Sequence, residues 1–279
     1  MLQTISMKRL LIALVFLAGF GVRGYCGRVD TLQVFSAAMH KEIPCVVIVP
    51  DLYGKIQADY PVLYLLHGYS GNYLDWITKV PELRHYVDEY HLIIVCPDGG
   101  FSSWYFDSPI DSAFRYETFI TRELVPDIDA RYQTIPDREH RGICGLSMGG
   151  HGALYLAIRH QNEFGSAAAI SGGVDIMPFP NNWDIAKRLG DQATHRESWE
   201  RHSVINLVDS LKNGALKIAL DDGINDIFIK ENRALHQKLL GLHIDHDYTE
   251  RPGGHTWSYW RNAIPYELLF FYRTFYPHP

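Results

Sequence analysis

Cysteine is scarce in this sequence, and the common metal-binding patterns are missing. Only four of the 279 residues are cysteine, too few for a disulfide-rich scaffold. There is no Cys-x-x-Cys pair and no His-Glu-x-x-His segment. We therefore expect no metal site, and we interpret Cys45, Cys96 and Cys144 as small buried side chains of apolar strands. The alternative is a disulfide between Cys96 and Cys144, which requires that their two strands be neighbours in the sheet.

An excess of positive charge is also missing. The chain has 26 Lys and Arg residues against 32 Asp and Glu residues, a formal charge of −6. Nucleic acids are bound mainly through clustered Lys and Arg, so the acidic balance argues against a nucleic-acid partner. No internal repeat or linker divides the sequence. With 47% hydrophobic residues, the chain is expected to fold around one sizeable core.

No apolar run reaches the roughly 20 residues that a bilayer-spanning helix needs. The run Leu10–Phe20 follows Lys8 and Arg9 and precedes small and polar residues, the order typical of a secretory signal peptide. We expect residues 1–26 to be this signal peptide and residues 27–279 to be a single folded domain. The mature protein is then exported, either periplasmic or secreted.

Cleavage of the signal peptide is expected between Gly24 and Gly27. Lipidation of Cys26 is the less favoured alternative, because Arg23 and Tyr25 replace the small or aliphatic residues expected before a lipidated cysteine. Residues 1–26 contain three cations and no acid, so their removal lowers the formal charge from −6 to −9.

Apolar runs separated by Gly, Pro and polar residues predict eight strands that alternate with helices. The strands are expected at 32–37, 43–49, 62–66, 92–96, 141–144, 167–170, 216–220 and 244–249. Helical patterns cover 83–90, 114–130, 153–158, 227–240 and 257–275, with Pro126 expected to break or kink the second of them. Residues 174–203 have no clean period. The first two strands resemble an antiparallel pair, and the remainder predicts a mostly parallel sheet with helices on both faces.

The segment Gly145-Leu146-Ser147-Met148-Gly149 lies between an expected strand and an expected helix. This is the setting of a nucleophile elbow, in which a strained turn presents a serine at the end of a sheet. Gly145 and Gly149 have no side chains, which at these two positions would collide with the turn. We interpret Ser147 as a nucleophile. The alternative is a purely structural turn.

A serine hydroxyl needs a base to remove its proton and an acid to orient that base. Among 14 histidines, His255 is the best candidate base, because two glycines free the loop that holds it after the last strand. His151 is expected to line the site, and His67 to brace the loop after the third strand. Asp221, Asp222 and Asp226 all qualify as the orienting acid, since each lies in the acidic loop expected after the seventh strand. From position alone, the choice between Asp222 and Asp226 stays open.

The oxyanion that forms during acyl transfer requires preorganised N–H donors. The backbone N–H of Met148, at the N-terminus of the elbow helix, is one candidate. The second is expected from the His67-Gly68-Tyr69 loop, where we choose the N–H of Tyr69.

Together these segments resemble the esterase D-like family of α/β-hydrolases, which includes S-formylglutathione hydrolases, tributyrin esterases, and feruloyl and acetylxylan esterases. The resemblance extends across most of the mature chain. The matching segments are Leu65-Leu66-His67-Gly68-Tyr69-Ser70-Gly71-Asn72, Pro97-Asp98-Gly99-Gly100, Glu123-Leu124-Val125-Pro126-Asp127-Ile128, Gly145-Leu146-Ser147-Met148-Gly149-Gly150, Gly223-Ile224-Asn225-Asp226 and His255-Thr256-Trp257.

The resemblance implies the α/β-hydrolase fold for residues 27–279 and favours Asp226, at the end of its Gly-x-x-Asp segment, as the acid. It implies a serine esterase that acts through an acyl-enzyme and needs no cofactor. We expect Trp104, Tyr105, His151 and Trp257 to contact the substrate.

Export favours small acyl or hydroxycinnamoyl esters of plant-polysaccharide-derived saccharides over formylglutathione. The expected partner is therefore a small-molecule or oligosaccharide ester. Two alternatives are an acyltransferase of the mycolyltransferase type and a catalytically silent binding protein.

Overall fold

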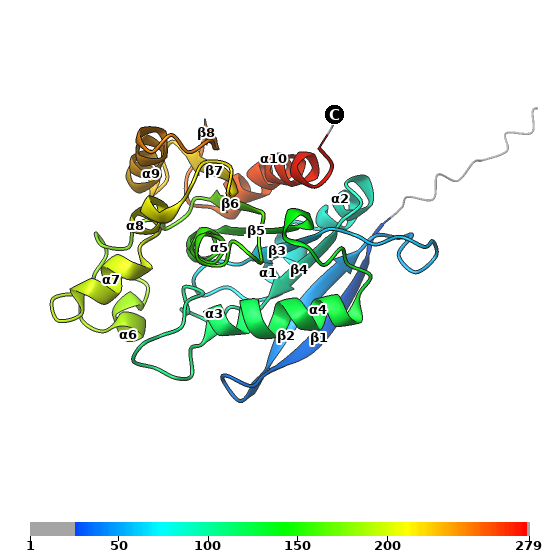
Figure 1. Cartoon of the computed structure of the whole chain (residues 1–279), viewed down its shortest axis with the longest axis horizontal. Coiled ribbons are helices and arrows are strands. Elements are labelled where there is room, and N and C mark those ends of the chain that lie inside the picture. The colour runs from blue at the N-terminus through cyan, green and yellow to red at the C-terminus, as the bar shows by residue number, and fades with distance from the viewer. Residues whose placement is uncertain (1–25, 278–279) are drawn as a thin grey trace, which may run out of the picture.

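The computed structural model describes residues 26–277, in which one eight-stranded sheet crosses the whole molecule (Figure 1). The expected signal peptide lies outside the described residues, except for Cys26. The strand order is β1-β2-β4-β3-β5-β6-β7-β8. The strands are β1 (Arg28–Ser36), β2 (Lys41–Val49), β3 (Val62–Leu66), β4 (Ile93–Pro97), β5 (Arg141–Leu146), β6 (Ser166–Ile170), β7 (Lys217–Gly223) and β8 (Asp247–Arg251).

The sheet is parallel except at one edge. β1 pairs antiparallel with β2, and β2 pairs antiparallel with β4. Every other neighbouring pair is parallel. The opening antiparallel pair and the mostly parallel sheet predicted from the sequence are therefore confirmed. Because the carboxyl ends of β3, β5, β6, β7 and β8 meet at one edge, the loops that follow them can build one site.

Helices cover both faces of the sheet, as predicted. They are α1 (Asp75–Lys79), α2 (Leu83–Glu89), α3 (Tyr116–Thr118), α4 (Val125–Arg131), α5 (Met148–Arg159), α6 (Ile185–Leu189), α7 (Arg196–His202), α8 (Val204–Leu207), α9 (Ile229–Gly241) and α10 (Trp257–Phe275). One buried cluster joins the sheet to α3, α4, α5, α8 and α9. The cluster on the opposite face joins it to α1, α2 and α10. This two-sided burial explains why β3 and β4 are apolar at every position.

Pro126 does not break its helix. A π-helical segment, Phe119–Leu124, joins α3 to α4, and the proline occupies the first turn of α4. Proline lacks the N–H that a regular helix would bond to the carbonyl four residues earlier, and its ring clashes with that carbonyl. The wider π turn immediately before the proline accommodates both effects. Of the two outcomes expected at Pro126, the break is therefore wrong, and the kink stays a prediction.

All four cysteines in the described residues are free. A disulfide between Cys96 and Cys144 is ruled out by topology, because β3 lies between β4 and β5 in the sheet. Cys45, Cys96 and Cys144 are buried, and burial raises the pKa of each thiol. The interpretation of these three cysteines as small buried side chains is confirmed.

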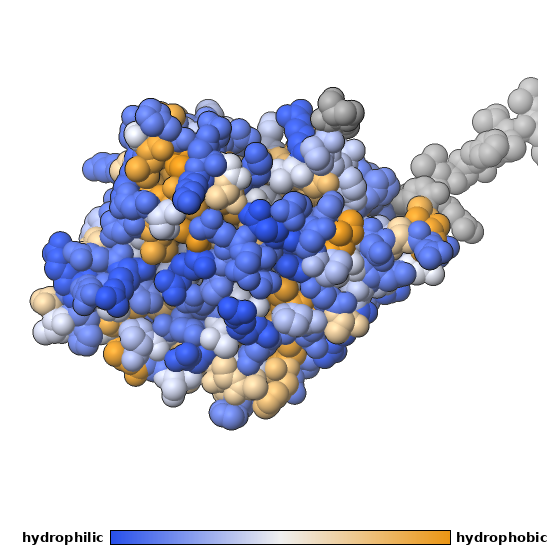
Figure 2. All heavy atoms as spheres, in the orientation of Figure 1, coloured by the Kyte–Doolittle hydropathy of each residue, from blue (hydrophilic) through white to orange (hydrophobic). Residues whose placement is uncertain are grey.

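The surface is mostly hydrophilic on the face shown in Figure 2, where hydrophobic residues form only small groups. Within residues 26–277, no helix combines the length and the apolar character that crossing a bilayer requires.

Candidate active site

Ser147 occupies the sharp turn between β5 and α5. Its backbone angles are φ 55° and ψ −118°, a strained conformation for a residue with a side chain. A Cβ on Gly145 would lie 2.4 Å from the backbone of Gly149, and a Cβ on Gly149 would lie 2.6 Å from the carbonyl oxygens of Leu66 and His67. The two glycines thus allow β5, α5 and the end of β3 to approach closely enough to form the elbow.

The structure brings Ser147, His255 and Asp226 into one chain of contacts. His255 Nε2 lies 2.9 Å from Ser147 Oγ, and His255 Nδ1 lies 3.0 Å from both carboxylate oxygens of Asp226. Asp226 is 4% exposed and Ser147 is 8% exposed. An imidazole held in this way donates its Nδ1 proton to the carboxylate and presents Nε2 as the acceptor for the serine proton.

Two loops at the ends of β7 and β8 hold this arrangement. The N–H of Ile224 donates to the carbonyl of Arg251, and the N–H of Asn225 donates to the carbonyl of Gly253, both at 2.9 Å. A Cβ on Gly223 would lie 2.6 Å from the Gly253 carbonyl oxygen. The close approach of these loops places Asp226 beside His255.

Aromatic rings fix the orientation of the His255 imidazole. The ring of Phe228 packs against it edge to face with centroids 5.4 Å apart, and the ring of Trp260 does so at 5.0 Å. Phe228 follows Asp226 by two residues, and its N–H donates to Asp226 Oδ1 at 2.9 Å. The same short segment therefore orients both the acid and the base.

Asp221 and Asp222 belong to β7, so the predicted acidic exit loop starts later than expected. Asp221 accepts from the Tyr259 hydroxyl at 2.5 Å and pairs with Arg251. Asp222 is fully buried and accepts from the N–H of Gly223 at 2.8 Å. Burial, followed by the negative charge of Asp226, raises the pKa of Asp222 to about 8. Of the two candidates, Asp226 is the one in contact with His255.

Two backbone N–H groups beside Ser147 have no hydrogen-bond partner among residues 26–277, those of Tyr69 and Met148. A Cβ on Gly68 would lie 3.3 Å from Ser147 Cβ, so the loop after β3 contacts the serine. His67 braces this loop, as expected from the sequence. Its Nε2 accepts from the N–H of Gly99 at 2.7 Å, and its Nδ1 lies 2.8 Å from the Gly68 carbonyl oxygen.

A cavity of about 300 Å³ opens over Ser147. Trp257 lines it, as predicted, although its contact with a substrate is untested. The sequence interpretation missed Trp183, which lies in the unpatterned region 174–203, and Asp75. Trp260, on α10, lines the cavity as well. The full lining consists of Gly68, Tyr69, Gly71, Asp75, Leu146, Ser147, Trp183, His255, Thr256, Trp257 and Trp260.

Trp104, Tyr105 and His151 do not line this cavity, so the prediction that they contact substrate is wrong. Each is at most 1% exposed. Trp104 Nε1 donates to the Trp183 carbonyl at 3.1 Å, and the Tyr105 hydroxyl donates to the His67 carbonyl at 3.1 Å. The two ring nitrogens of His151 contact the carbonyl oxygens of Trp104 and His202. These side chains support the cavity wall from behind.

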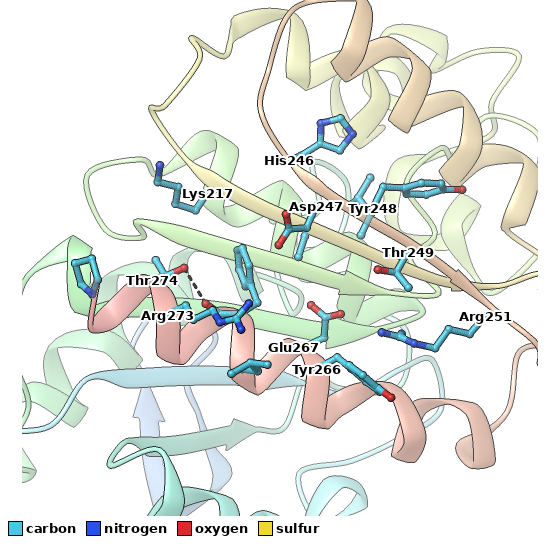
Figure 3. A pocket seen from close by; sticks show the side chains of 15 residues that line it. Lys217, His246, Asp247, Tyr248, Thr249, Arg251, Tyr266, Glu267, Arg273 and Thr274 are labelled. Atoms are coloured by element: carbon cyan, nitrogen blue, oxygen red, sulfur yellow. Dashed lines mark hydrogen bonds between the residues drawn. The ribbon is translucent and has the colours of Figure 1, made fainter. Parts of the chain in front are cut away.

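A second cavity, of about 750 Å³, lies between β8 and α10 (Figure 3). None of its lining residues lines the cavity over Ser147. In Figure 3, Glu267 extends from α10 toward the sheet, beside Arg251 and Thr249. Burial raises the pKa of Glu267 to about 8, an effect that Arg251 opposes and Asp247 reinforces. Glu267 Oε2 has no hydrogen-bond partner among the described residues.

Comparison with known proteins agrees with this fold. Esterase Rv1288 of Mycobacterium tuberculosis is 29% identical over 236 residues, which are 75% of this chain and 51% of that protein. The chain thus spans about half the length of that relative. The acetyl esterase of Caldicellulosiruptor saccharolyticus is 29% identical over 216 residues, which are 72% of this chain and 79% of that protein.

A solved structure of a ferulic acid esterase aligns with 90% of this chain and 99% of its own, at a TM-score of 0.77 and 28% identity. Residues 36–271 match the protein family described as "Putative esterase". Because this match covers most of the sequence, the chain belongs to that esterase family and has the α/β-hydrolase fold.

Proposed function

We propose that this protein is a serine carboxylic-ester hydrolase that acts through an acyl-enzyme. The observation that carries the proposal is the unbroken contact chain from Asp226 through His255 to Ser147. The serine faces a cavity beside two backbone N–H groups that have no hydrogen-bond partner in the part of the chain that the structure describes. Nucleophile, base, orienting acid and oxyanion donors are the complete set of groups that acyl transfer through serine requires.

In the first step, His255 Nε2 takes the proton of the Ser147 hydroxyl while Oγ attacks the ester carbonyl. The carbonyl oxygen becomes an oxyanion, which the N–H groups of Tyr69 and Met148 stabilise. Asp226 stabilises the imidazolium that forms. The bond to the alcohol oxygen then breaks, and His255 delivers its proton to the departing alcohol.

In the second step, water takes the place of the alcohol. His255 removes a proton from the water, whose oxygen attacks the acyl carbonyl of the Ser147 ester. The same two N–H groups stabilise the second oxyanion. When it collapses, the proton returns to Ser147 Oγ and the carboxylic acid leaves. Side chains and backbone groups thus supply every proton transfer and every charge contact in both steps.

The proposed substrates are small acyl or hydroxycinnamoyl esters of saccharides derived from plant polysaccharides. A cavity of about 300 Å³ suits an acyl group of modest size. Trp183, Trp257 and Trp260 provide aromatic walls for a planar acid or a sugar ring. The names of two relatives, acetyl esterase and ferulic acid esterase, favour these two acyl classes. Export of the protein, expected from residues 1–26, is part of this proposal.

A panel of esters tests the proposal, measured with the wild type and with Ser147→Ala. The panel contains p-nitrophenyl acetate, methyl ferulate, acetylated xylo-oligosaccharide, tributyrin and S-formylglutathione. We expect the wild type to hydrolyse at least one of them, and the variant to lose about 10⁴-fold or more in kcat. Equal rates for the two proteins would contradict the esterase proposal. Preferred transfer to an added alcohol over water would indicate an acyltransferase.

A further inference from the structure

We propose that Asp75 recognises the alcohol part of the substrate by accepting hydrogen bonds from its hydroxyl groups, so that the alcohol is a saccharide or a similar polyol. The inference rests on the proposed ester hydrolysis and specifies its substrate class. Nothing in the sequence patterns singled out this residue.

Asp75 is the first residue of α1, and its side chain lines the cavity that contains Ser147 and His255. Its Oδ2 accepts from the N–H of Asn72 at 3.1 Å, which fixes the orientation of the carboxylate. Its Oδ1 has no hydrogen-bond partner among residues 26–277. The carboxylate therefore offers a positioned acceptor to a group that enters the cavity.

An aromatic ring lines the same cavity as this acceptor. Trp257 lines the same cavity and is half-buried. Trp76 holds its ring from one side and Trp260 from another, both edge to face with centroids 5.3 Å apart. A fixed aromatic face packs against the C–H face of a sugar ring, and a carboxylate accepts from the hydroxyls at the ring edge. Asp75 and Trp257 together provide both contacts.

The charge of the cavity argues against an anionic alcohol or thiol. No Lys or Arg is among the residues that line it, and Asp75 adds a negative charge. The glutathione part of S-formylglutathione carries two carboxylates and one ammonium group, and its net negative charge is repelled by the carboxylate of Asp75. A neutral polyol has no such conflict and gains a charge-assisted hydrogen bond.

The test compares the wild type with Asp75→Asn by kcat/KM on three substrates. The asparagine keeps an oxygen for the Asn72 N–H but removes the negative charge. On acetylated xylo-oligosaccharide we expect a loss of about 5- to 10-fold, because a hydrogen bond to a charged acceptor is stronger than one to an amide. On p-nitrophenyl acetate, whose alcohol has no free hydroxyl, we expect a change of less than about 2-fold. On S-formylglutathione we expect a gain. Glu42→Gln, at an exposed position of β2, controls for the loss of one charge.

Equal losses on all three substrates would overturn the proposal and assign Asp75 a structural role in the turn at Asn72. An unchanged rate on the saccharide ester would also overturn it. If the wild type hydrolyses none of the three esters, the proposed function itself fails, and this result differs from either outcome for Asp75. A gain on S-formylglutathione together with the selective loss on the saccharide ester would support the proposal.

Discussion

The cavity over Ser147 and the cavity between β8 and α10 differ in how their polar groups are connected. The cavity over Ser147 measures about 300 Å³ and contains a chain of hydrogen bonds between 2.9 and 3.0 Å. The cavity between β8 and α10 measures about 750 Å³, yet the buried carboxyl of Glu267 lies there with one oxygen that no group within residues 26–277 bonds. The smaller cavity opens beyond the strand ends, where loops can converge. The larger one extends along the last two strands.

Size alone would therefore select the wrong cavity as the active site. Catalysis needs groups that are mutually oriented before the substrate arrives, and hydrogen bonds that run from one group to the next provide this orientation. A buried carboxyl group without a hydrogen-bond partner gives no such orientation. Its burial lowers the stability of the fold, because the group has lost its hydrogen bonds to water and burial disfavours its charged form. The difference between the two cavities can be measured, first through activity and then through stability.

The largest expected effect is on kcat, and it distinguishes substitution of Asp226 from substitution of Asp222. Asp226→Asn should lower kcat by about 10⁴-fold, because the amide no longer selects the tautomer of His255 in which Nε2 accepts the serine proton. Asp222→Asn should change kcat by no more than a few fold. Burial beside Asp226 keeps the Asp222 carboxyl neutral below about pH 8, and an amide is also neutral. Steady-state kinetics on p-nitrophenyl acetate at pH 7 measures both. Comparable losses would show that the acid has been misassigned.

A smaller loss of kcat is expected from a substitution in the loop that holds the Tyr69 N–H. In Gly68→Ala the new Cβ would lie 2.7 Å from a methyl group of Leu146 and 3.3 Å from Ser147 Cβ, so the loop must move away. Since loss of one oxyanion donor typically costs 10²- to 10³-fold, we expect kcat to fall by about 10²-fold. Gly241→Ala at the end of α9 is the control, because its Cβ would meet nothing within 4 Å. Full activity of Gly68→Ala would exclude this loop from oxyanion binding.

The smallest expected effect lies in the second cavity and concerns stability alone. Folded wild type keeps the Glu267 proton up to about pH 8, whereas the unfolded chain releases it near the ordinary glutamate pKa. Between these values the unfolded state binds fewer protons, so the contribution of Glu267 to stability falls as the pH rises. Glu267→Gln removes this dependence.

Thermal unfolding at pH 5 and pH 8 tests this effect. The Tm advantage of Glu267→Gln over the wild type should be larger at pH 8, by about 2–4 °C for each kcal/mol gained. Glu139→Gln, an exposed substitution, should show no such change between the two pH values. An equal Tm difference at both pH values would contradict the expectation. Activity on p-nitrophenyl acetate should stay within about 2-fold of wild type.

Local patterns predicted most of the sheet and the elbow. The apolar run at 62–66 and the Gly-x-Ser-x-Gly segment consist of residues adjacent in the sequence, so the strand and the turn that they form could be inferred directly. Predictions that depended on distant residues were less accurate. Trp104 and Tyr105 were expected to contact the substrate, but both are buried, and Trp104 packs against Trp183 of the region 174–203, which showed no period. The possible Cys96–Cys144 disulfide failed because strand order is a property of the whole sheet.

The sequence by itself determined the nucleophile and the base, because the strained turn at Ser147 requires its flanking glycines and His255 follows the last strand. From the residues alone it narrowed the acid to Asp222 and Asp226, and the family resemblance favoured Asp226. The tertiary structure brings the Asp226 carboxylate to His255, because hydrogen bonds between the loops after β7 and β8 set that distance. The lining of the cavity was decided in the same way. Asp75, Trp183 and Trp257 come from three distant segments, and only the packing of those segments against the sheet edge brings their side chains together around Ser147.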